Sequence, residues 1–218
     1  MPFFTRTAFP LSAKTLFIMG YPPIPWLGIM LAGFGAGKIF EMDFDERKKY
    51  FLRIGLGALL LFIVIRSINI YGDSAPWSTQ KSGFYTFLSF INVTKYPPSL
   101  IFCLSTLGIV FLVFYFFEGV ENKFTKFVTV YGRVPLFYFI VHLYLLHILM
   151  LFIMFAQGFK LSDLEFGFNL GRPKAASGVE LWSIYLIWLS VVLVLYPVCK
   201  WFGNYKAQHP EKIWLRYF

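Results

Sequence analysis

Charged residues are scarce in this sequence of 218 residues, of which 14% are Asp, Glu, Lys or Arg and 58% are hydrophobic. Soluble domains carry about 25% charged and about 45–50% apolar residues. Three stretches, 96–117, 134–159 and 181–199, contain no charged residue at all. Each is near or above the roughly 18–20 residues that span the hydrocarbon layer of a bilayer. The shortage of charge therefore excludes a water-soluble globular protein and indicates an integral membrane protein.

Familiar catalytic and ligand-binding motifs are missing as well. The sequence has no glycine-rich phosphate loop, no serine nucleophile elbow, no paired metal-ligand motif and no pair of carboxylates inside an apolar run. Its two cysteines, Cys103 and Cys199, lie within apolar runs, which favours small buried side chains over a disulfide framework or a metal site. The first fourteen residues lack a long apolar stretch before a cleavage site, so we expect no signal peptide.

The net charge of +9 comes from short basic clusters between the apolar runs, not from one continuous basic face. This pattern excludes nucleic-acid binding and is typical of the cytoplasmic bias of Lys and Arg in membrane proteins. Eleven of the twenty Lys and Arg lie in residues 38–53, in 118–126 and in the C-terminal tail. We therefore expect the C-terminus in the cytoplasm and the N-terminus outside, in a bacterial inner membrane.

The apolar runs predict an all-α fold, a single polytopic transmembrane domain over residues 1–218 with about five membrane-spanning helices. The expected spans are 22–40, 50–70, 98–117, 127–155 and 179–202, with loops over 71–96 and 156–179. The span over 50–70 is the weakest, because Arg53 and Arg66 bracket only twelve uncharged residues. Gly33 and Gly37 are spaced four apart, which predicts close approach of a neighbouring helix.

An ionisable side chain inside a span is costly and is therefore a candidate for function. His142 lies within the predicted span 127–155, and Tyr138, four residues earlier, shares its helical face. Such a histidine could act as a general base or bind a polar ligand. The alternative is a hydrogen bond between helices that only fixes their packing.

A second group of polar residues comprises Arg66, Asn69 and Asp73. Their spacing of three and then four predicts one stripe at the outer end of the second span. This stripe could line a polar cavity. Alternatively, Arg66 and Asp73 could form an ion pair that caps the helix at the membrane surface.

A third group, Asn92, Lys95, Tyr96 and Ser99, lies where the loop enters the third predicted span. The start of a helix favours negative charge, so Asn92 and Lys95 could bind an anionic ligand or a sugar there. The alternative is that Lys95 and Tyr96 anchor the helix at the depth of the lipid headgroups.

Five stretches carry a resemblance that covers nearly the whole chain. They are YPPIPWLGIMLAGFGAGKIF, RIGLGALLLFIVIRSINIYGD, NVTKYPPSLIFCLSTLG, YGRVPLFYFIVHLYLLH and YPVCKWFGNYKAQHPEKIWLRYF. In this order they resemble the heparan-α-glucosaminide N-acetyltransferase-like membrane proteins, which include bacterial proteins with the DUF1624 domain. The resemblance implies a multi-helix acyltransferase that uses acetyl-CoA as donor and an amino sugar or related acceptor on the far side of the membrane.

The resemblance also implies that the chain corresponds to the C-terminal half of such an acyltransferase. Family members are nearly twice as long, and their first half carries a D-x-L-R-G-type helix and the histidine implicated in acetyl transfer, neither of which is present here. The catalytic residue is therefore unknown, and whether the chain alone is an enzyme stays open. Asn92, Lys95, Tyr138 and His142 would supply part of the cavity, completed by N-terminal helices or a partner chain.

Two other classes of function remain alternatives. A small transporter or channel subunit could line its path with Arg66 and His142, although five spans give no inverted repeat of the kind that many transporters show. A membrane scaffold without chemistry of its own is the other alternative.

Overall fold

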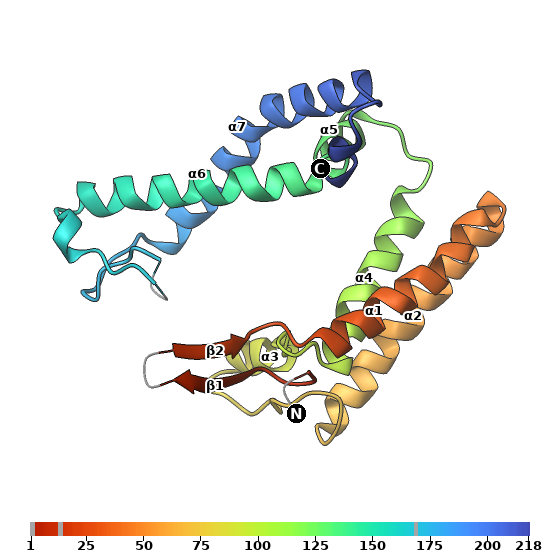
Figure 1. Cartoon of the computed structure of the whole chain (residues 1–218). Helices are drawn as coiled ribbons and strands as arrows, with labels where there is room; N and C mark the ends of the chain where they lie inside the picture. Colours follow the sequence, from red (N-terminus) through yellow and green to blue (C-terminus); the bar gives the residue numbers. More distant parts are fainter. Residues whose placement is uncertain (1–2, 13–14, 168–169) are drawn as a thin grey trace. The chain divides into compact units, whose positions relative to one another are not determined.

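The computed structural model describes residues 3–12, 15–167 and 170–218 (Figure 1). Within these residues the chain forms seven α-helices, three short 3-10 helices and one two-stranded hairpin. Five helical segments are long and apolar enough to cross a membrane. They are Pro23–Glu41, Phe44–Ile68, Leu100–Phe117, Pro135–Ala156 and Leu181–Gln208. The predicted all-α transmembrane fold is confirmed.

Most span boundaries lie close to their predicted places. The first segment is the helix α1 (Pro23–Ala36), which continues as the 3-10 helix η1 (Gly37–Glu41). The helix α2 (Phe44–Ile68) begins earlier than expected, and α4 (Leu100–Phe117) agrees closely with the prediction. The helix α7 (Leu181–Gln208) extends past the expected end at residue 202.

The single span predicted over 127–155 is wrong, because it is divided into α5 (Lys123–Gly132) and α6 (Pro135–Ala156). Proline has no backbone N–H, and it disfavours helical dihedral angles in the preceding residue. Val134 accordingly has φ −138° and ψ 51°, outside the helical region. The apolar run continues through this break, so hydropathy alone does not reveal it. The membrane-spanning helix is α6.

Two elements formed where no regular structure was predicted. The strands β1 (Thr7–Ser12) and β2 (Thr15–Met19) pair in antiparallel fashion before the first span. The helix α3 (Gly83–Ile91) lies inside the predicted loop 71–96. The hydroxyl of Ser82 caps α3 by accepting a hydrogen bond from the backbone N–H of Tyr85.

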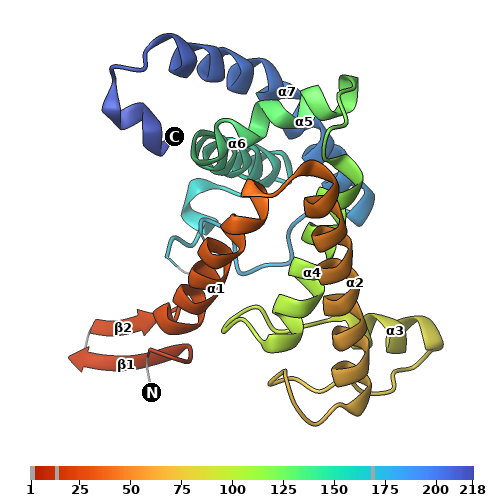
Figure 2. The ribbon, with the colours of Figure 1, turned by 90° about the vertical axis from the view of Figure 1, so that its right-hand side faces the viewer.

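The chain packs as two compact units, residues 1–120 and residues 121–218. The antiparallel pair α2 and α4 forms the centre of the first unit (Figure 2). A Cβ atom at Gly55 would lie 2.8 Å from Leu112, and one at Gly108 would lie 2.9 Å from Leu59. Glycines at these two positions therefore permit the close approach of the two helices.

The predicted glycine pair does not have this role in the described part of the chain. A Cβ atom at Gly33 or Gly37 would meet nothing within 4 Å, and α1 has no buried residue. Spacing alone indicates that a helix can come close, and it does not identify which glycines have a neighbour.

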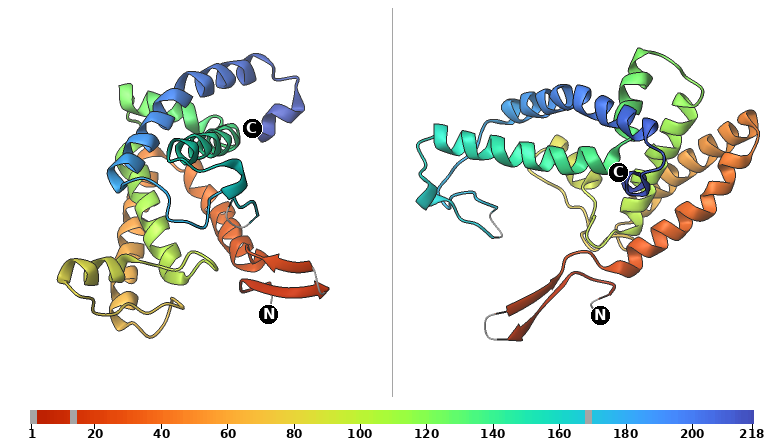
Figure 3. Two further views of the ribbon diagram at one scale, coloured as in Figure 1. Left: turned by 90° about the vertical axis from the view of Figure 1, so that its left-hand side faces the viewer. Right: turned by 45° about the horizontal axis from the view of Figure 1, so that its top comes forward.

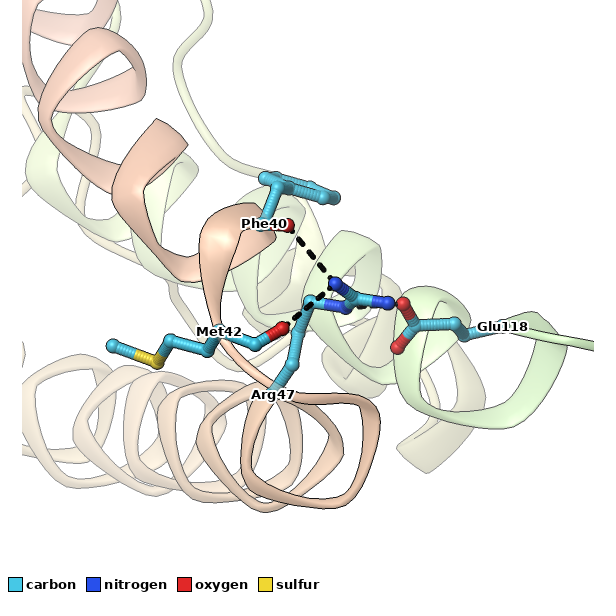
Figure 4. Close-up of polar contacts among 4 residues, drawn as sticks. All are labelled: Phe40, Met42, Arg47 and Glu118. Carbon is cyan, nitrogen blue, oxygen red and sulfur yellow. Dashed lines mark hydrogen bonds and ion pairs between the residues drawn. The ribbon is translucent and has the colours of Figure 1, made fainter.

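At one end of this unit, Arg47 joins three segments (Figure 4). Its guanidinium forms an ion pair with Glu118, just after α4, and donates to the carbonyls of Phe40 at 2.9 Å and Met42 at 3.0 Å. The side chains of Arg47 and Glu118 are only 20% and 17% exposed. Charge-assisted bonds in such a setting are stronger than neutral ones, so Arg47 fixes the connection from η1 into α2.

In the second unit, α5 and α6 pack on α7. The buried core contains Val134, Val191, Leu195, Cys199, Phe202 and Leu215. The rings of Phe137 and Phe202 stack with centroids 4.0 Å apart, and the hydroxyl of Tyr131 donates to the carbonyl of Val192. The break before Pro135 thus lets α5 fold back onto α7.

We predict that Gly55→Ala destabilises the first unit, whereas Gly57→Ala does not. The new methyl group at residue 55 would meet Leu112 at 2.8 Å and the carbonyl oxygen of Gly108 at 3.1 Å, while residue 57 faces open space. Overpacking costs about 1–3 kcal/mol, and alanine gains up to about 1 kcal/mol over glycine in a helix. Thermal unfolding in detergent measures both variants. Equal melting temperatures for the two would contradict the proposed role of Gly55.

Candidate functional site

The last turn of α2 carries Arg66, a fully buried cation with 1% of its surface exposed. Its guanidinium donates four hydrogen bonds, each to a backbone carbonyl: Nε to Phe90 at 2.8 Å, Nη1 to Ala75 at 3.0 Å, and Nη2 to Ser89 at 3.1 Å and Asn92 at 2.7 Å. Two of these carbonyls belong to the last turn of the helix α3 and a third to its C-cap residue Asn92, where carbonyls lack partners inside the helix and where the helix dipole favours a cation. Arg66 therefore attaches the end of α3 to the end of α2.

Trp77 and Asn69 complete the surroundings of this arginine. The indole N–H of Trp77 donates to the carbonyl of Arg66 at 2.9 Å. The amide side chain of Asn69 donates to the carbonyl of Trp77 at 2.9 Å and accepts from its backbone N–H at 3.0 Å. Asn69 has the left-handed conformation, with φ 58°, that commonly ends a helix. The loop after α2 is thus folded back over its own last turn.

Asp73 forms a second, complementary centre of hydrogen bonds. Its carboxylate accepts from the backbone N–H of Ala75 at 2.9 Å and of Thr94 at 2.8 Å, from the Thr94 hydroxyl, and from the Ser99 hydroxyl at 2.9 Å. Ser99 is also the residue that caps α4, by accepting from the N–H of Phe102 at 2.9 Å. Partial burial by itself raises the pKa of Asp73, but these hydrogen bonds outweigh it and hold the pKa below its ordinary value.

These contacts correct the predicted stripe of Arg66, Asn69 and Asp73. The helix α2 ends at Ile68, so Asp73 lies in the loop beyond it. No ion pair joins Arg66 to Asp73 in the part of the chain that the structure describes. Arg66 binds carbonyls and Asp73 binds N–H and hydroxyl groups, and together they fix the segment from residue 89 to residue 99.

Lys95 and Tyr96 lie on the outside of this fixed segment. The ammonium of Lys95 is 5.2 Å and the guanidinium carbon of Arg6 is 5.6 Å from the centre of the Tyr96 ring. The hydroxyls of Tyr96 and Tyr21 are 2.9 Å apart. The hydrogen bond that joins them lowers the pKa of Tyr96, as does Lys95, and it raises the pKa of Tyr21. The result is a cluster of two cations and two phenols, in which Lys95, Arg6 and Tyr21 are exposed and Tyr96 is half-buried.

Sequence reasoning selected Lys95 and Tyr96 but missed Arg6 and Tyr21. These two residues belong to the N-terminal hairpin region, and Tyr21 is 75 residues from Tyr96. No local pattern indicates such a contact. Asn92, also predicted, follows the last residue of α3 and binds Arg66 through its backbone carbonyl, while its side chain is exposed.

The other two predicted residues, Tyr138 and His142, belong to the second unit, on α6. Their rings stack in parallel with centroids 5.1 Å apart, and both side chains are half-buried. The Nδ1 atom of His142 lies 3.1 Å from the carbonyl of Tyr138. Because a carbonyl only accepts, Nδ1 carries the proton in this bond, which leaves Nε2 of a neutral imidazole as an acceptor. His209 repeats this arrangement with Tyr205 at the end of α7.

The second unit also has an open depression of about 670 Å³, located in the loop between α6 and α7. Its lining comprises Gln157, Phe159, Ser183 and residues 176–180. It contains none of the predicted site residues. In residues 3–12, 15–167 and 170–218, no three His, Cys, Asp or Glu side chains are grouped so as to hold a metal ion.

Comparisons with known proteins give no match to any protein-family model, to any curated protein or to any solved structure.

We predict that Asp73→Asn removes an acid-sensitive part of the stability. Because the pKa of Asp73 is lowered in the folded state, its contribution is present above the ordinary aspartate pKa of about 3.9 and is lost as the pH falls below that value. An asparagine amide cannot accept all the bonds that the carboxylate accepts. Thermal melting between neutral pH and a pH below about 3.9 measures the difference. The variant should be less stable than the wild type at neutral pH, and this gap should narrow on acidification; a constant gap would contradict the assignment.

Proposed function

We propose that this chain forms part of a membrane acyltransferase that transfers an acetyl group from acetyl-CoA to an amino sugar or a related acceptor. The observation that supports the proposal best is the fixed segment NVTKYPPS, at residues 92–99. Buried Arg66 and the Asp73 carboxylate hold its backbone, so Lys95 and Tyr96 project from a preorganised support. The same segment is one of the five that resemble the acetyltransferase-like family.

The chemistry of this surface suits a sugar acceptor. Aromatic ring faces pack against the apolar faces of a sugar ring, and phenols and cations supply hydrogen bonds to hydroxyl or anionic substituents. Tyr96, Tyr21 and Lys95 offer these groups within one cluster. In the proposal this cluster binds the acceptor.

His142 has a separate role in the proposal. Nδ1 donates to the carbonyl of Tyr138, so Nε2 is the ring atom left to face a substrate. It can therefore bind a polar group of a substrate or accept its proton. The family resemblance implicates a different histidine in acetyl transfer. In the proposal, N-terminal helices or a partner chain supply that histidine.

The proposal also includes the location of the protein. Residues 38–53, residues 118–126 and the C-terminal tail hold eleven Lys and Arg, which favours their cytoplasmic side in a bacterial inner membrane. Lys95 lies near the start of α4, whereas Glu118 lies at its end. The acceptor surface is then on the far side of the membrane.

Transfer of labelled acetyl from acetyl-CoA to glucosamine tests the proposal, in membranes that contain the chain expressed with its native flanking sequence. We expect His142→Ala to lower the rate by about 100-fold or more if it accepts the proton. His209→Ala is the matched control, because His209 has the same contact with a tyrosine four residues earlier.

Lys95→Met should weaken acceptor binding by roughly tenfold, as expected for loss of a charge-assisted hydrogen bond. Lys81→Met is its control, because Lys81 also lies over a tyrosine ring, that of Tyr85, at 4.3 Å. Absence of acetyl transfer together with absence of acetyl-CoA binding would overturn the proposal. Solute flux through liposomes containing the same protein would then favour a transporter or channel subunit.

A further inference from the structure

We propose that α3 is an interfacial helix that inserts one apolar stripe into the bilayer at the boundary between headgroups and acyl chains. Phe84, Phe87, Leu88 and Ile91 follow the spacing i, i+3, i+4, i+7 of a single helical face. All four are exposed, by 66%, 56%, 37% and 44%. With nine residues, α3 is far shorter than the roughly 20 residues that a membrane span requires.

The opposite face of α3 is occupied by the protein itself. The hydroxyl of Thr86 accepts from the backbone N–H of Gln80 at 2.9 Å, and that of Ser89 accepts from the N–H of Ser78 at 3.1 Å. The ring of Phe90 packs edge-on against Trp77, with centroids 5.6 Å apart. These contacts fix the rotation of the helix about its axis. The apolar stripe therefore points away from the loop.

The depth of α3 is fixed by the end of α2. Arg66, in the last turn of that span, holds the carbonyls of Ser89 and Phe90. One turn earlier, Phe62 contacts the ring of Phe90 at 5.9 Å between centroids. Figures 2 and 3 show α3 lying across the end of α2 and not along it. A helix in this position lies at the level where the span leaves the hydrocarbon.

The bilayer is the partner that this position indicates. On α2, Leu61 and Ile68 are 51% and 58% exposed within a segment long and apolar enough to cross the membrane, so this side of the helix is open to lipid. Lys81 precedes α3, and its ammonium lies 4.3 Å from the centre of the Tyr85 ring. A lysine beside a tyrosine at headgroup depth is a typical interfacial anchor. The exposed apolar stripe of α3 lies next to this anchor, at the position of a lipid-facing surface.

Insertion of α3 does not require the proposed acetyl transfer, and it affects any ligand of the segment 92–99. Asn92 directly follows α3 and is bound to Arg66 through its carbonyl. Insertion of α3 would keep this segment at the surface of the membrane. A ligand of Lys95 and Tyr96 would then bind at the depth of the lipid headgroups.

Fluorescence quenching at single cysteines tests the insertion in liposomes. Phe87→Cys and Phe84→Cys are each labelled with bimane in a Cys103→Ala background, while Cys199, which is 1% exposed, is left in place. Thr79→Cys, at an exposed loop residue, is the control for a position facing water. The quenchers are aqueous iodide and lipids that carry a nitroxide near the headgroup or near the acyl terminus.

We expect lipids labelled near the headgroup to quench residues 84 and 87 most strongly, at a depth of roughly 5–10 Å into the headgroup and acyl boundary. Iodide should quench both positions much less than it quenches residue 79. Iodide quenching equal to that at residue 79 would show that the stripe faces water. Protection from iodide and from both lipid quenchers would show that protein covers it. Either result overturns the proposal, and the two test positions guard against one variant that does not fold.

Discussion

The fold of the first unit depends on the hydrogen bonds between the guanidinium of Arg66 and four backbone carbonyls. A charged side chain at the end of a membrane span is costly unless its donors are satisfied. The carbonyls at the end of α3 are equally costly when buried without partners. Arg66 satisfies both requirements at once, because its planar group presents five donors in a fixed geometry. The loop after α2 must therefore fold back over the helix from which it came.

Asp73 complements Arg66, because its negative carboxylate accepts hydrogen bonds where the positive guanidinium donates them. Its carboxylate accepts hydrogen bonds from the backbone N–H of Thr94 and the hydroxyl of Ser99. Arg66 donates to the carbonyls of Ser89, Phe90 and Asn92, just before them in the sequence. The segment between is held from both sides, and Lys95 and Tyr96 project from it without having to support it. A rigid support with adaptable polar groups on its surface is the arrangement expected of a binding site. The proposed acceptor site and the proposed interfacial position of α3 both rest on this one set of contacts.

Hydropathy was sufficient to predict the membrane class and the five spans, because the hydrocarbon layer imposes length and composition directly. It failed where local chemistry competes with hydropathy. The break at Val134 precedes a proline inside an apolar run, and α3 is an amphipathic helix too short to register as a span. The cost of burying charge drew attention to Arg66, yet its partners lie up to 26 residues away and no pattern predicts them. The pairing of Tyr21 with Tyr96 and the close packing at Gly55 and Gly108 are likewise set by tertiary structure.

Hydrogen exchange of the backbone amides of residues 83–99 in Arg66→Lys tests the central role of this arginine most directly. Lysine keeps the charge, but its single ammonium with three donors cannot reproduce the four bonds of the guanidinium fork. Arg53→Lys, at an exposed arginine of the same helix, is the control. We predict that exchange in residues 83–99 becomes faster in Arg66→Lys and stays unchanged in Arg53→Lys. Unchanged exchange in Arg66→Lys would show that the segment is held by other contacts and would contradict this account.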